Sequence, residues 1–392
     1  MRRRNANLVF SLLFLLALIV MIGLLFAGRS NTTDFYENRT LAERPATSRE
    51  AVMDGSWVNE WETFLTDHVK GRTWLIKADT ALHLKLLRQP VVNGVLVTKD
   101  RLLGFNSYGR WDTDYLSDSA EQAASELETV FADYISGGGT VLYLALPEQY
   151  SYYRTYYPSY TENRQWLLEP MHAIWMDALE RHGIPCVDMY EVYETMGVPA
   201  EMYSATDHHY SYYGAYCAYR TAMETIGQMT TLAPPVLGEE DLRLTALPNP
   251  YLGSRNRKLY GLAFRDEQLV YAEPVEPIPF ERIDNGWYTE PWLYELPETE
   301  DEVITYNVYM GGDHGETILR TNREELPDLL IVGESFTNAL EPLFYASFDE
   351  TRSLDPRFYG GGLTMQEYLA DYRPDVVIIV RDDTAYFNPL GV

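Results

Sequence analysis

The chain of 392 residues contains only two cysteines, Cys186 and Cys217. Two cysteines cannot build a disulfide framework, and neither lies in a C-x-x-C pair, so a zinc ribbon is excluded. Basic residues are also scarce, with 31 Lys and Arg against 58 Asp and Glu and a formal net charge of −27. Because so acidic a chain repels phosphate backbones, we expect no nucleic-acid partner. The H-E-x-x-H and G-x-S-x-G signatures of two hydrolase classes are absent as well.

One long hydrophobic run is present, from Leu8 to Ala27, directly after three arginines at residues 2–4. As a helix it is about 30 Å long, which matches the core of a bilayer. The alternative is a cleaved signal peptide, whose apolar core is usually about 7–15 residues and ends in a small-x-small site. Residues 24–28 fit such a site poorly, so we expect an uncleaved anchor. The arginines then keep the N-terminus in the cytoplasm.

Three regions are expected along the chain. Residues 1–28 form a cytoplasmic tip and transmembrane anchor, residues 29–50 a polar stalk, and residues 51–392 one extracellular domain. The protein is therefore expected in the cell membrane with a single pass. Residues 233–300 are richer in proline, acidic and aromatic residues, and are interpreted as a possible flap or sub-domain.

Apolar strands and amphipathic helices alternate within the expected domain. Strands are predicted at 140–146, 184–189, 328–332 and 375–381, and helices within 57–87 and at 117–135, 164–182, 212–229 and 364–372. This alternation predicts an α/β fold with a mostly parallel sheet and helices on both faces. Ligands in such folds bind beyond the carboxyl ends of the strands.

Ser335 follows one of these predicted strands in the sequence Gly333-Glu334-Ser335-Phe336. The glycine permits a tight turn, and amides at the start of a following helix can stabilise an oxyanion. These features favour Ser335 as a nucleophile. The alternative is a serine that only caps a helix.

A base for this serine is found in Asp207-His208-His209, just before the helix predicted at 212–229. In an extended segment Asp207 and His209 project to one side and His208 to the other. Asp207 can then orient His209, whose second nitrogen faces Ser335. The alternative is that Asp207 caps the helix.

A metal site is the other interpretation of these residues, with Asp313 and His314 as further ligand types. Neighbouring histidines seldom bind one ion, and no known metal-binding spacing is present. We therefore expect neither a metal nor a cofactor.

Tyrosines are frequent near the predicted ligand edge, with six of them in residues 150–160. Flat rings with hydroxyl tips suit stacking on sugars. Tyr150, Tyr153 and Tyr210 are therefore candidate substrate-binding residues, and ordinary core packing is the alternative.

Together these motifs resemble the DHHW family of bacterial membrane-anchored proteins, which is related to SGNH-hydrolase-like alginate O-acetyltransferase proteins. The resemblance covers nearly the whole ectodomain and rests on residues 207–210 (DHHY), 333–336 (GESF), 37–39 (ENR), 93–95 (NGV), 311–314 (GGDH) and 355–357 (DPR). Tyr210 stands where the family motif has Trp, and Glu334 replaces the commoner Asp.

The resemblance implies an SGNH-hydrolase-like domain in which Ser335 is acylated, His209 is the base and Asp207 orients it. It also implies a membrane-bound O-acyltransferase partner that supplies acetyl groups, which the serine protein passes to hydroxyls of a cell-surface polysaccharide or exopolysaccharide. The asparagine block that supplies an oxyanion donor in SGNH proteins is not identifiable, so the amide of Ser335 and Gly312 are suggested instead. Because transfer and hydrolysis share an acyl-enzyme, a glycan acetylesterase remains an alternative. A non-catalytic scaffold of a polysaccharide-modification complex is another.

Overall fold

The computed structural model describes residues 2–28, 31–105 and 112–390, and it divides into two compact units. The first comprises Met1–Asn93 and Arg257–Leu262, and the second comprises Gly94–Asn256 and Ala263–Val392. The sequence placed 51–392 in one domain, so the structure differs in assigning residues 51–93 to the first unit. Apart from 257–262, the segment 233–300 belongs to the second unit.

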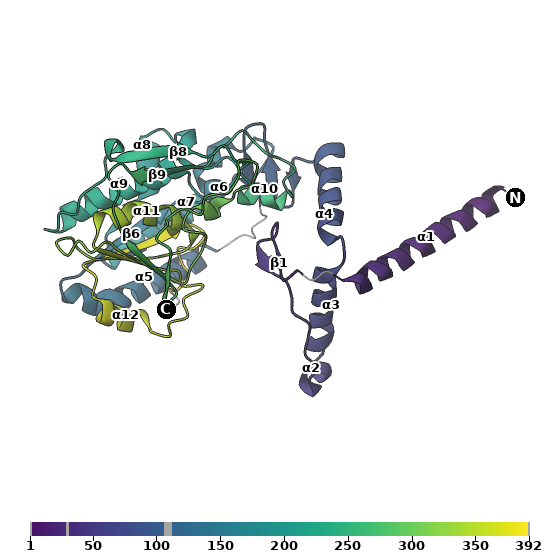
Figure 1. The fold of residues 1–392 in the computed structure, drawn as a ribbon, viewed down its shortest axis with the longest axis horizontal. Coiled ribbons are helices and arrows are strands. Elements are labelled where there is room, and N and C mark those ends of the chain that lie inside the picture. Colours follow the sequence, from purple (N-terminus) through teal and green to yellow (C-terminus); the bar gives the residue numbers. More distant parts are fainter. Residues whose placement is uncertain (1, 29–30, 106–111, 391–392) are drawn as a thin grey trace. The chain divides into compact units, whose positions relative to one another are not determined.

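The first unit contains the long N-terminal helix α1 (Arg2–Ala27), labelled in Figure 1. Its stretch Asn7–Leu24 is long and apolar enough to cross a membrane, a measure that a signal sequence also meets. The helices expected within 57–87 are present as α3 (Ser56–His68) and α4 (Arg72–Ala81), and α4 continues into a π-helical turn at Leu82–Leu86. The other elements are α2 (Arg49–Asp54), β1 (Thr33–Asp34), β2 (Arg39–Thr40) and β3 (Val91–Val92).

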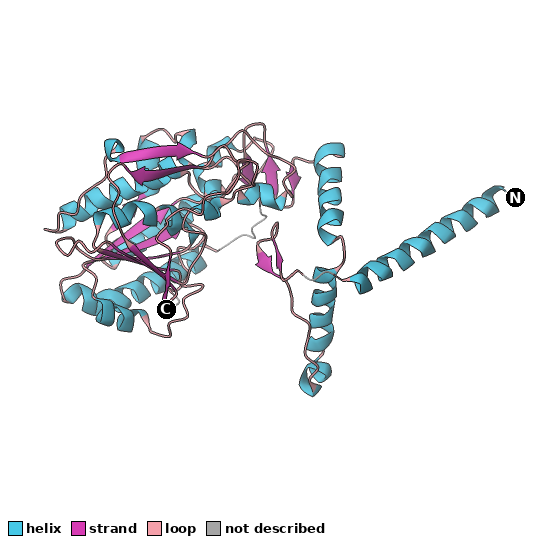
Figure 2. Cartoon of the chain, viewed as in Figure 1, coloured by secondary structure: helices cyan, strands magenta, loops and turns pink. Residues whose placement is uncertain are grey.

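The second unit is built on a mixed eight-stranded sheet with the order β11-β10-β12-β14-β13-β15-β6-β7. Figure 2 shows its strands in magenta among the helices. The neighbours from β14 to β7 are parallel, whereas β10, β11 and β12 pair antiparallel at the other end. The strands are β6 (Thr140–Leu146), β7 (Cys186–Asp188), β10 (Glu281–Asp284), β11 (Trp287–Thr289), β12 (Glu316–Arg320), β13 (Leu329–Gly333), β14 (Glu350–Leu354) and β15 (Val376–Asp382). The predicted α/β class is confirmed.

Helices cover both faces of the parallel part of this sheet. On one face α5 (Thr113–Ser136), α7 (Gln165–Arg181) and α12 (Met365–Tyr372) bury their apolar sides against alternate strand residues such as Tyr143, Val332 and Ile379. On the other face α9 (Tyr212–Met229) packs on β6 and β7, and α11 (Glu341–Phe344) packs on β14. Figure 1 shows β6 between α5 and α9. This burial of alternate side chains fixes the register of the strands.

Local signals set several element boundaries. Helix α12 begins with the predicted capping box, in which the hydroxyl of Thr364 accepts from the amide of Glu367 and the Glu367 carboxylate accepts from the amide of Thr364. Helix α5 starts four residues before the expected position, because Asp112 accepts from the amide of Asp114 and caps it there. The remaining elements of this unit include α6 (Gln149–Tyr152), α8 (Met189–Thr195), β4 (Val95–Val97), β5 (Leu102–Gly104), β8 (Leu242–Ala246) and β9 (Val270–Pro274), and α10 (Ser254–Lys258) lies across the boundary between the units.

Candidate active site

Asp207, His209 and Ser335 form a continuous hydrogen-bonded series. The Nε2 atom of His209 lies 2.7 Å from the Oγ atom of Ser335, and its Nδ1 atom lies 2.7 Å from Oδ1 of Asp207. Asp207 is 2% exposed and His209 4%. The expected convergence of these three residues is therefore present. A carboxylate can only accept, so Nδ1 carries the proton and Nε2 accepts from the serine hydroxyl.

Burial and the contacts with neighbouring side chains together set the charge state of His209 and Asp207. The pKa of His209 is lowered to about 3, mainly by burial and next by the nearby His208, while Asp207 acts in the opposite direction. For Asp207 burial acts to raise the pKa, but the adjacent imidazoles and their hydrogen bonds outweigh it and hold that pKa well below the usual range. The site thus contains an ionised carboxylate and a neutral imidazole that can accept a proton.

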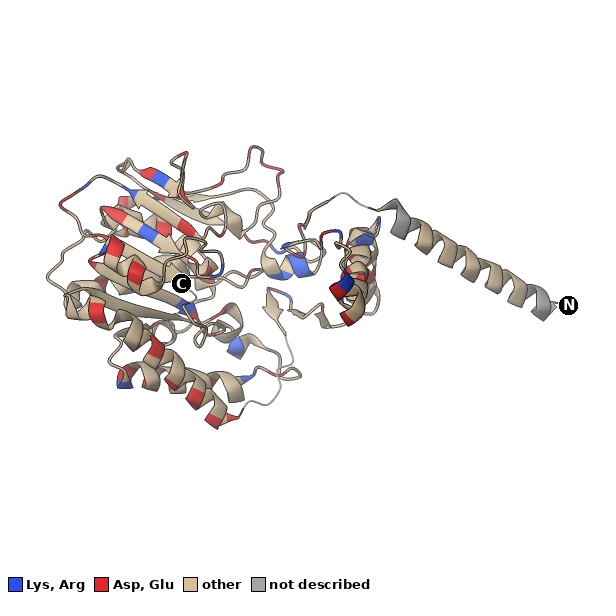
Figure 3. Ribbon diagram, turned by 90° about the horizontal axis from the view of Figure 1, so that it is seen from below, with Lys and Arg blue, Asp and Glu red and all other residues tan. Residues whose placement is uncertain are grey.

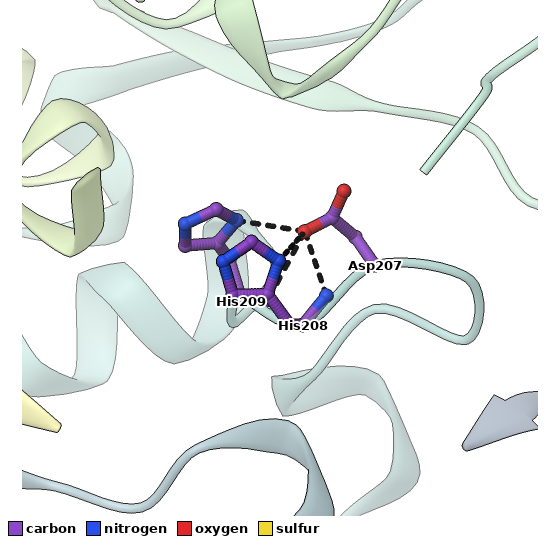
Figure 4. A group of neighbouring side chains, drawn as sticks. All are labelled: Asp207, His208 and His209. Atoms are coloured by element: carbon purple, nitrogen blue, oxygen red, sulfur yellow. Dashed lines mark hydrogen bonds and ion pairs between the residues drawn. The ribbon is translucent and has the colours of Figure 1, made fainter. Parts of the chain in front are cut away.

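His208 does not point away from the site. Its Nδ1 atom lies 3.2 Å from Oδ1 of Asp207, and its ring lies 3.7 Å from the ring of His209, so both imidazoles flank one carboxylate (Figure 4). The prediction of opposite sides was wrong because the segment forms a bend and not an extended strand. Ligand atoms of these three residues lie within 4.8 Å of one another, as a metal ion would require. However, the same atoms of Asp207 and His209 already bond to each other, to Ser335 and to the amide of Ser254.

Neither Asp207 nor Ser335 is the N-cap residue of the helix at its position in the chain. Helix α9 is capped by Ser211, whose hydroxyl accepts from the amide of Tyr213, so Asp207 is not its cap. The short helix that contains Ser335 is 3-10 rather than the expected α-helix, spans Ser335–Ala339 and is preceded by Glu334 at the cap position. Both simple capping alternatives are therefore excluded for Asp207 and Ser335.

Ser335 is held at the carboxyl end of β13 by close packing and by ion pairs. A Cβ atom on Gly333 would lie 2.7 Å from the carbonyl oxygen of Val380 on the neighbouring strand, so only glycine fits at this point. The carboxylate of Glu334 pairs with Arg381 at 2.7 Å and with Arg357 at 3.5 Å. These contacts fix the backbone on both sides of the turn that presents the serine.

A loop that the sequence reasoning missed supports Asp207 from the other side. The amide of Ser254 donates to Oδ2 of Asp207 at 2.6 Å, and the Ser254 hydroxyl lies 2.7 Å from Nδ1 of His208. A Cβ atom on Gly253 would lie 2.4 Å from the backbone carbonyl of Thr206. The tripeptide 252–254 carries no recognisable motif, so only its contacts reveal this role.

Glu267 and Tyr306 also brace the site without any sequence signal. The Glu267 carboxylate accepts from the amide of Ala205 at 2.8 Å and from the hydroxyl of Thr206 at 2.6 Å. The ring of Tyr306 stacks on the imidazole of His209, while Phe336 contacts that imidazole with its edge. His209 is thus enclosed by aromatic carbon, which explains its low pKa.

The predicted substrate-binding tyrosines lie mostly in the interior. Tyr153 is fully buried and donates to the carbonyls of Ala200 and Tyr203, and Tyr210 is 1% exposed and donates to the carbonyl of Phe336. Both rings are buried and both hydroxyls bond to backbone carbonyls, which favours the packing alternative for these two. Tyr150 is also buried, but it lines a cavity described below.

Gly312 is unsuited to the oxyanion role suggested for it. Its amide donates to the carbonyl of Tyr309 at 3.1 Å in a turn with φ of +98°. An amide engaged in this way is not free to bind an oxyanion.

Comparison with known proteins agrees with this geometry. A family model described as SGNH hydrolase-like domain, acetyltransferase AlgX matches residues 108–274, which include Asp207 and His209. The second unit of the chain has an SGNH-like α/β fold. The family match supports an acyltransferase or esterase in general terms. Ser335 lies outside the matched range, so its assignment depends on the contacts in the structure. No curated protein matches the chain.

Solved structures share this SGNH-like fold. Bacillus cereus PatB1 is 21% identical with a TM-score of 0.64, over 76% of this chain and 98% of that one. A PatB1 structure with a sulfonyl adduct gives 19% identity and a TM-score of 0.62 over the same shares. A DHHW family protein from Eubacterium siraeum is 18% identical with a TM-score of 0.58, over 77% of this chain and 94% of that one. The resemblance to DHHW and SGNH-like proteins is thus confirmed.

Proposed function

We propose that this protein is an extracytoplasmic O-acetyltransferase that acylates hydroxyls of a cell-surface polysaccharide or exopolysaccharide through an acyl-enzyme on Ser335. The observation that best supports the proposal is the series from Asp207 through His209 to Ser335, with both hydrogen bonds at 2.7 Å. Asp207 and His209 lie within residues 108–274, which match an acetyltransferase family.

In the first half-reaction the Ser335 oxygen attacks the acyl carbonyl of the donor while Nε2 of His209 takes the hydroxyl proton. The tetrahedral intermediate collapses when the bond to the leaving oxygen breaks and His209 returns the proton to that oxygen. Asp207 stabilises the imidazolium that forms between these steps. We assign the backbone amide of Ser335 as one donor to the oxyanion.

In the second half-reaction a sugar hydroxyl attacks the acetyl ester on Ser335. His209 takes the proton of that hydroxyl, and the serine oxygen leaves and recovers the proton. The product is an acetylated sugar and free enzyme. If water attacked instead, the same residues would act as an acetylesterase, so access of the sugar to the ester decides the outcome.

The apolar helix of the first unit supports a proposed setting for the reaction. We assign α1 as a single-pass anchor because of its length and apolar character, with the catalytic unit outside the cell. A donor of acetyl groups is then needed across the membrane, and a membrane-bound O-acyltransferase is the proposed partner.

The test uses the full chain in detergent micelles with 4-nitrophenyl acetate. Ser335→Ala is expected to lose at least about a thousandfold in kcat/KM, since Ser335 is the proposed site of the acyl-enzyme. Ser125→Ala, an exposed serine of α5, serves as the matched control and keeps the wild-type rate. Equal rates for Ser335→Ala and wild type would overturn the catalytic proposal and favour a scaffold.

A mass measurement separates transfer from hydrolysis. With an acetyl donor and an oligosaccharide acceptor, a transferase adds the mass of acetyl groups to the acceptor. Acetate release with an unchanged acceptor would assign the protein as an esterase.

A further inference from the structure

A cavity of about 510 Å³ lies at the carboxyl ends of β6 and β15. Its walls include Gln122 and Glu126 of α5, Leu168 of α7, Glu148 after β6 and Asp383 after β15. The volume falls within the range of about 300–1,000 Å³ that small-molecule sites occupy. Neither the series Asp207, His209 and Ser335 nor its mechanism uses the side chains that line this cavity.

The walls of the cavity are of two kinds. Leu167, Leu168, Tyr386 and Phe387 supply apolar and aromatic surface. Glu148, Arg255 and Asp383 supply polar groups, and each is less than a tenth exposed. A sugar ring has apolar C–H faces and hydroxyls around its edge. Its faces can pack on the apolar and aromatic side chains, and its hydroxyls can bond to the polar ones.

The lining of this cavity contains two arginines, Arg164 and Arg255, and three acidic residues, Glu126, Glu148 and Asp383. Glu148 and Arg255 form an ion pair with each other. Burial, followed by the neighbouring Asp382, raises the pKa of Asp383 well above its usual range, which disfavours a negative charge at this position. Glu126 adds a negative charge at the exposed side. The guanidinium of Arg164 lies 4.4 Å from the ring centre of Tyr150. With two arginines beside three acidic residues, the lining has no excess of cations that would favour a uronate, whereas an uncharged sugar can hydrogen-bond to these groups.

The charge of the surrounding surface also favours a neutral polymer over a polyanion. The chain carries a net charge of −27, and Figure 3 shows acidic residues along the helices of the second unit. A polyanionic polymer would therefore be repelled over a range of about 8 Å at physiological ionic strength. A neutral polymer avoids this repulsion.

The cavity and the candidate active site are connected through a backbone hydrogen bond, adjacent residues and neighbouring strands. The amide of Gln149, next to Glu148, donates to the carbonyl of His208 at 3.2 Å. Arg255 directly follows Ser254, whose amide bonds to Asp207. In addition β15 pairs with both β6 and β13, and paired strands lie about 4.8 Å apart, so the ends of all three share one edge of the sheet.

We propose that this cavity binds an uncharged sugar residue of the acceptor and that it selects neutral glycans over polyuronates. The inference rests on the proposed function, because the sugar in this cavity is taken to be part of the acceptor of the transferase.

The experiment titrates the full chain in micelles with neutral tetrasaccharides, of hexose and of N-acetylhexosamine units, and with an oligouronate of equal length. Wild type is expected to bind at least one neutral ligand at least tenfold more tightly than the oligouronate. Gln122→Trp narrows the cavity and is expected to weaken neutral binding at least tenfold. Ser125→Trp, an exposed position on the same helix outside the cavity, leaves binding unchanged. Glu126→Lys is expected to raise the oligouronate affinity.

Three results would overturn the inference: tighter binding of the oligouronate, no measurable binding of any neutral ligand, or equal affinities for Gln122→Trp and Ser125→Trp. Ester cleavage by Ser335→Ala separates the two proposals. If Ser335→Ala cleaves the ester like wild type but neutral sugars still bind in the cavity, the proposed function is wrong and the proposed sugar site is retained. If the ester is cleaved only with Ser335 present and no neutral ligand binds, the cavity proposal alone fails.

Discussion

The ring of Tyr306 lies flat on the imidazole of His209, with centroids 3.8 Å apart and planes 9° apart. The stack leaves both nitrogens of His209 free to bond to Asp207 and Ser335 in the ring plane. The Tyr306 hydroxyl is buried and has no hydrogen-bond partner among the residues that the structure describes. The ring, and not the hydroxyl, is therefore the part of Tyr306 that holds the base in place.

Removing the Tyr306 ring should reduce ester cleavage, and removing its hydroxyl should not. We expect Tyr306→Ala to lower kcat/KM about 2- to 10-fold, because an aromatic pair of this kind is worth about 0.5–1.5 kcal/mol. Tyr306→Phe keeps the stack and should retain the wild-type rate and stability. Steady-state kinetics and urea unfolding of both variants check this, and a large loss in Tyr306→Phe would contradict it.

The amide of Ser254 should matter more than its hydroxyl. Ser254 is the first residue of α10, a position that tolerates proline, so Ser254→Pro removes the donor to Asp207 with little cost to the helix. A hydrogen bond to a charged group is worth about 1.5–3 kcal/mol, so we expect kcat/KM to fall roughly 10- to 150-fold. Ser254→Ala keeps the amide and is the control. Equal losses in the two variants would assign the effect to the contact with His208.

The low pKa of His209 should appear in the pH dependence of both activity and stability. Its folded-state pKa of about 3 lies below the ordinary value of 6.5, so between these pH values the unfolded chain binds more protons. The free energy of unfolding should therefore fall as the pH drops from 6.5 toward 3, by up to about 1.4 kcal/mol per pH unit. Urea titrations at several pH values measure this, and His209→Asn should flatten the dependence. The acid limb of kcat/KM should lie below pH 6.5, and a limb above that value would contradict the neutral base.

Close packing at Gly253 predicts that alanine lowers the stability there, whereas alanine at the open position Gly227 does not. In Gly253→Ala the new methyl would lie 2.4 Å from the carbonyl of Thr206, so we expect a loss of about 1–3 kcal/mol and a displaced Asp207. Gly227→Ala, in α9 with no atom within 4 Å, should gain about 0.5–1 kcal/mol. Thermal unfolding compares the two, and similar effects would show that the loop 252–254 can move freely.

Part of the second unit could be predicted, because β6, β7, β13, β15, α5, α7, α9 and α12 each have a local signal. The sheet strands β10, β11, β12 and β14 were not predicted. Helix α9 has the predicted bounds, and the capping box of α12 operates within four residues. The motifs at 207–209 and 333–336 indicated the resemblance and the three central residues. The bend at His208 and the 3-10 turn at Ser335 were missed, because tertiary contacts rather than local preference determine them.

The sequence by itself determined the alternation of apolar strands with helices, the apolar N-terminal run and the presence of a carboxylate, an imidazole and a hydroxyl in recognisable motifs. These depend on side chains a few residues apart, whose interactions act within a turn or a strand. Only the tertiary structure decided that His209 and Ser335, 126 positions apart, are hydrogen bonded, and that Ser254 and Tyr306 support them. The order of strands in the sheet sets those distances, and that order follows from burial of the whole core.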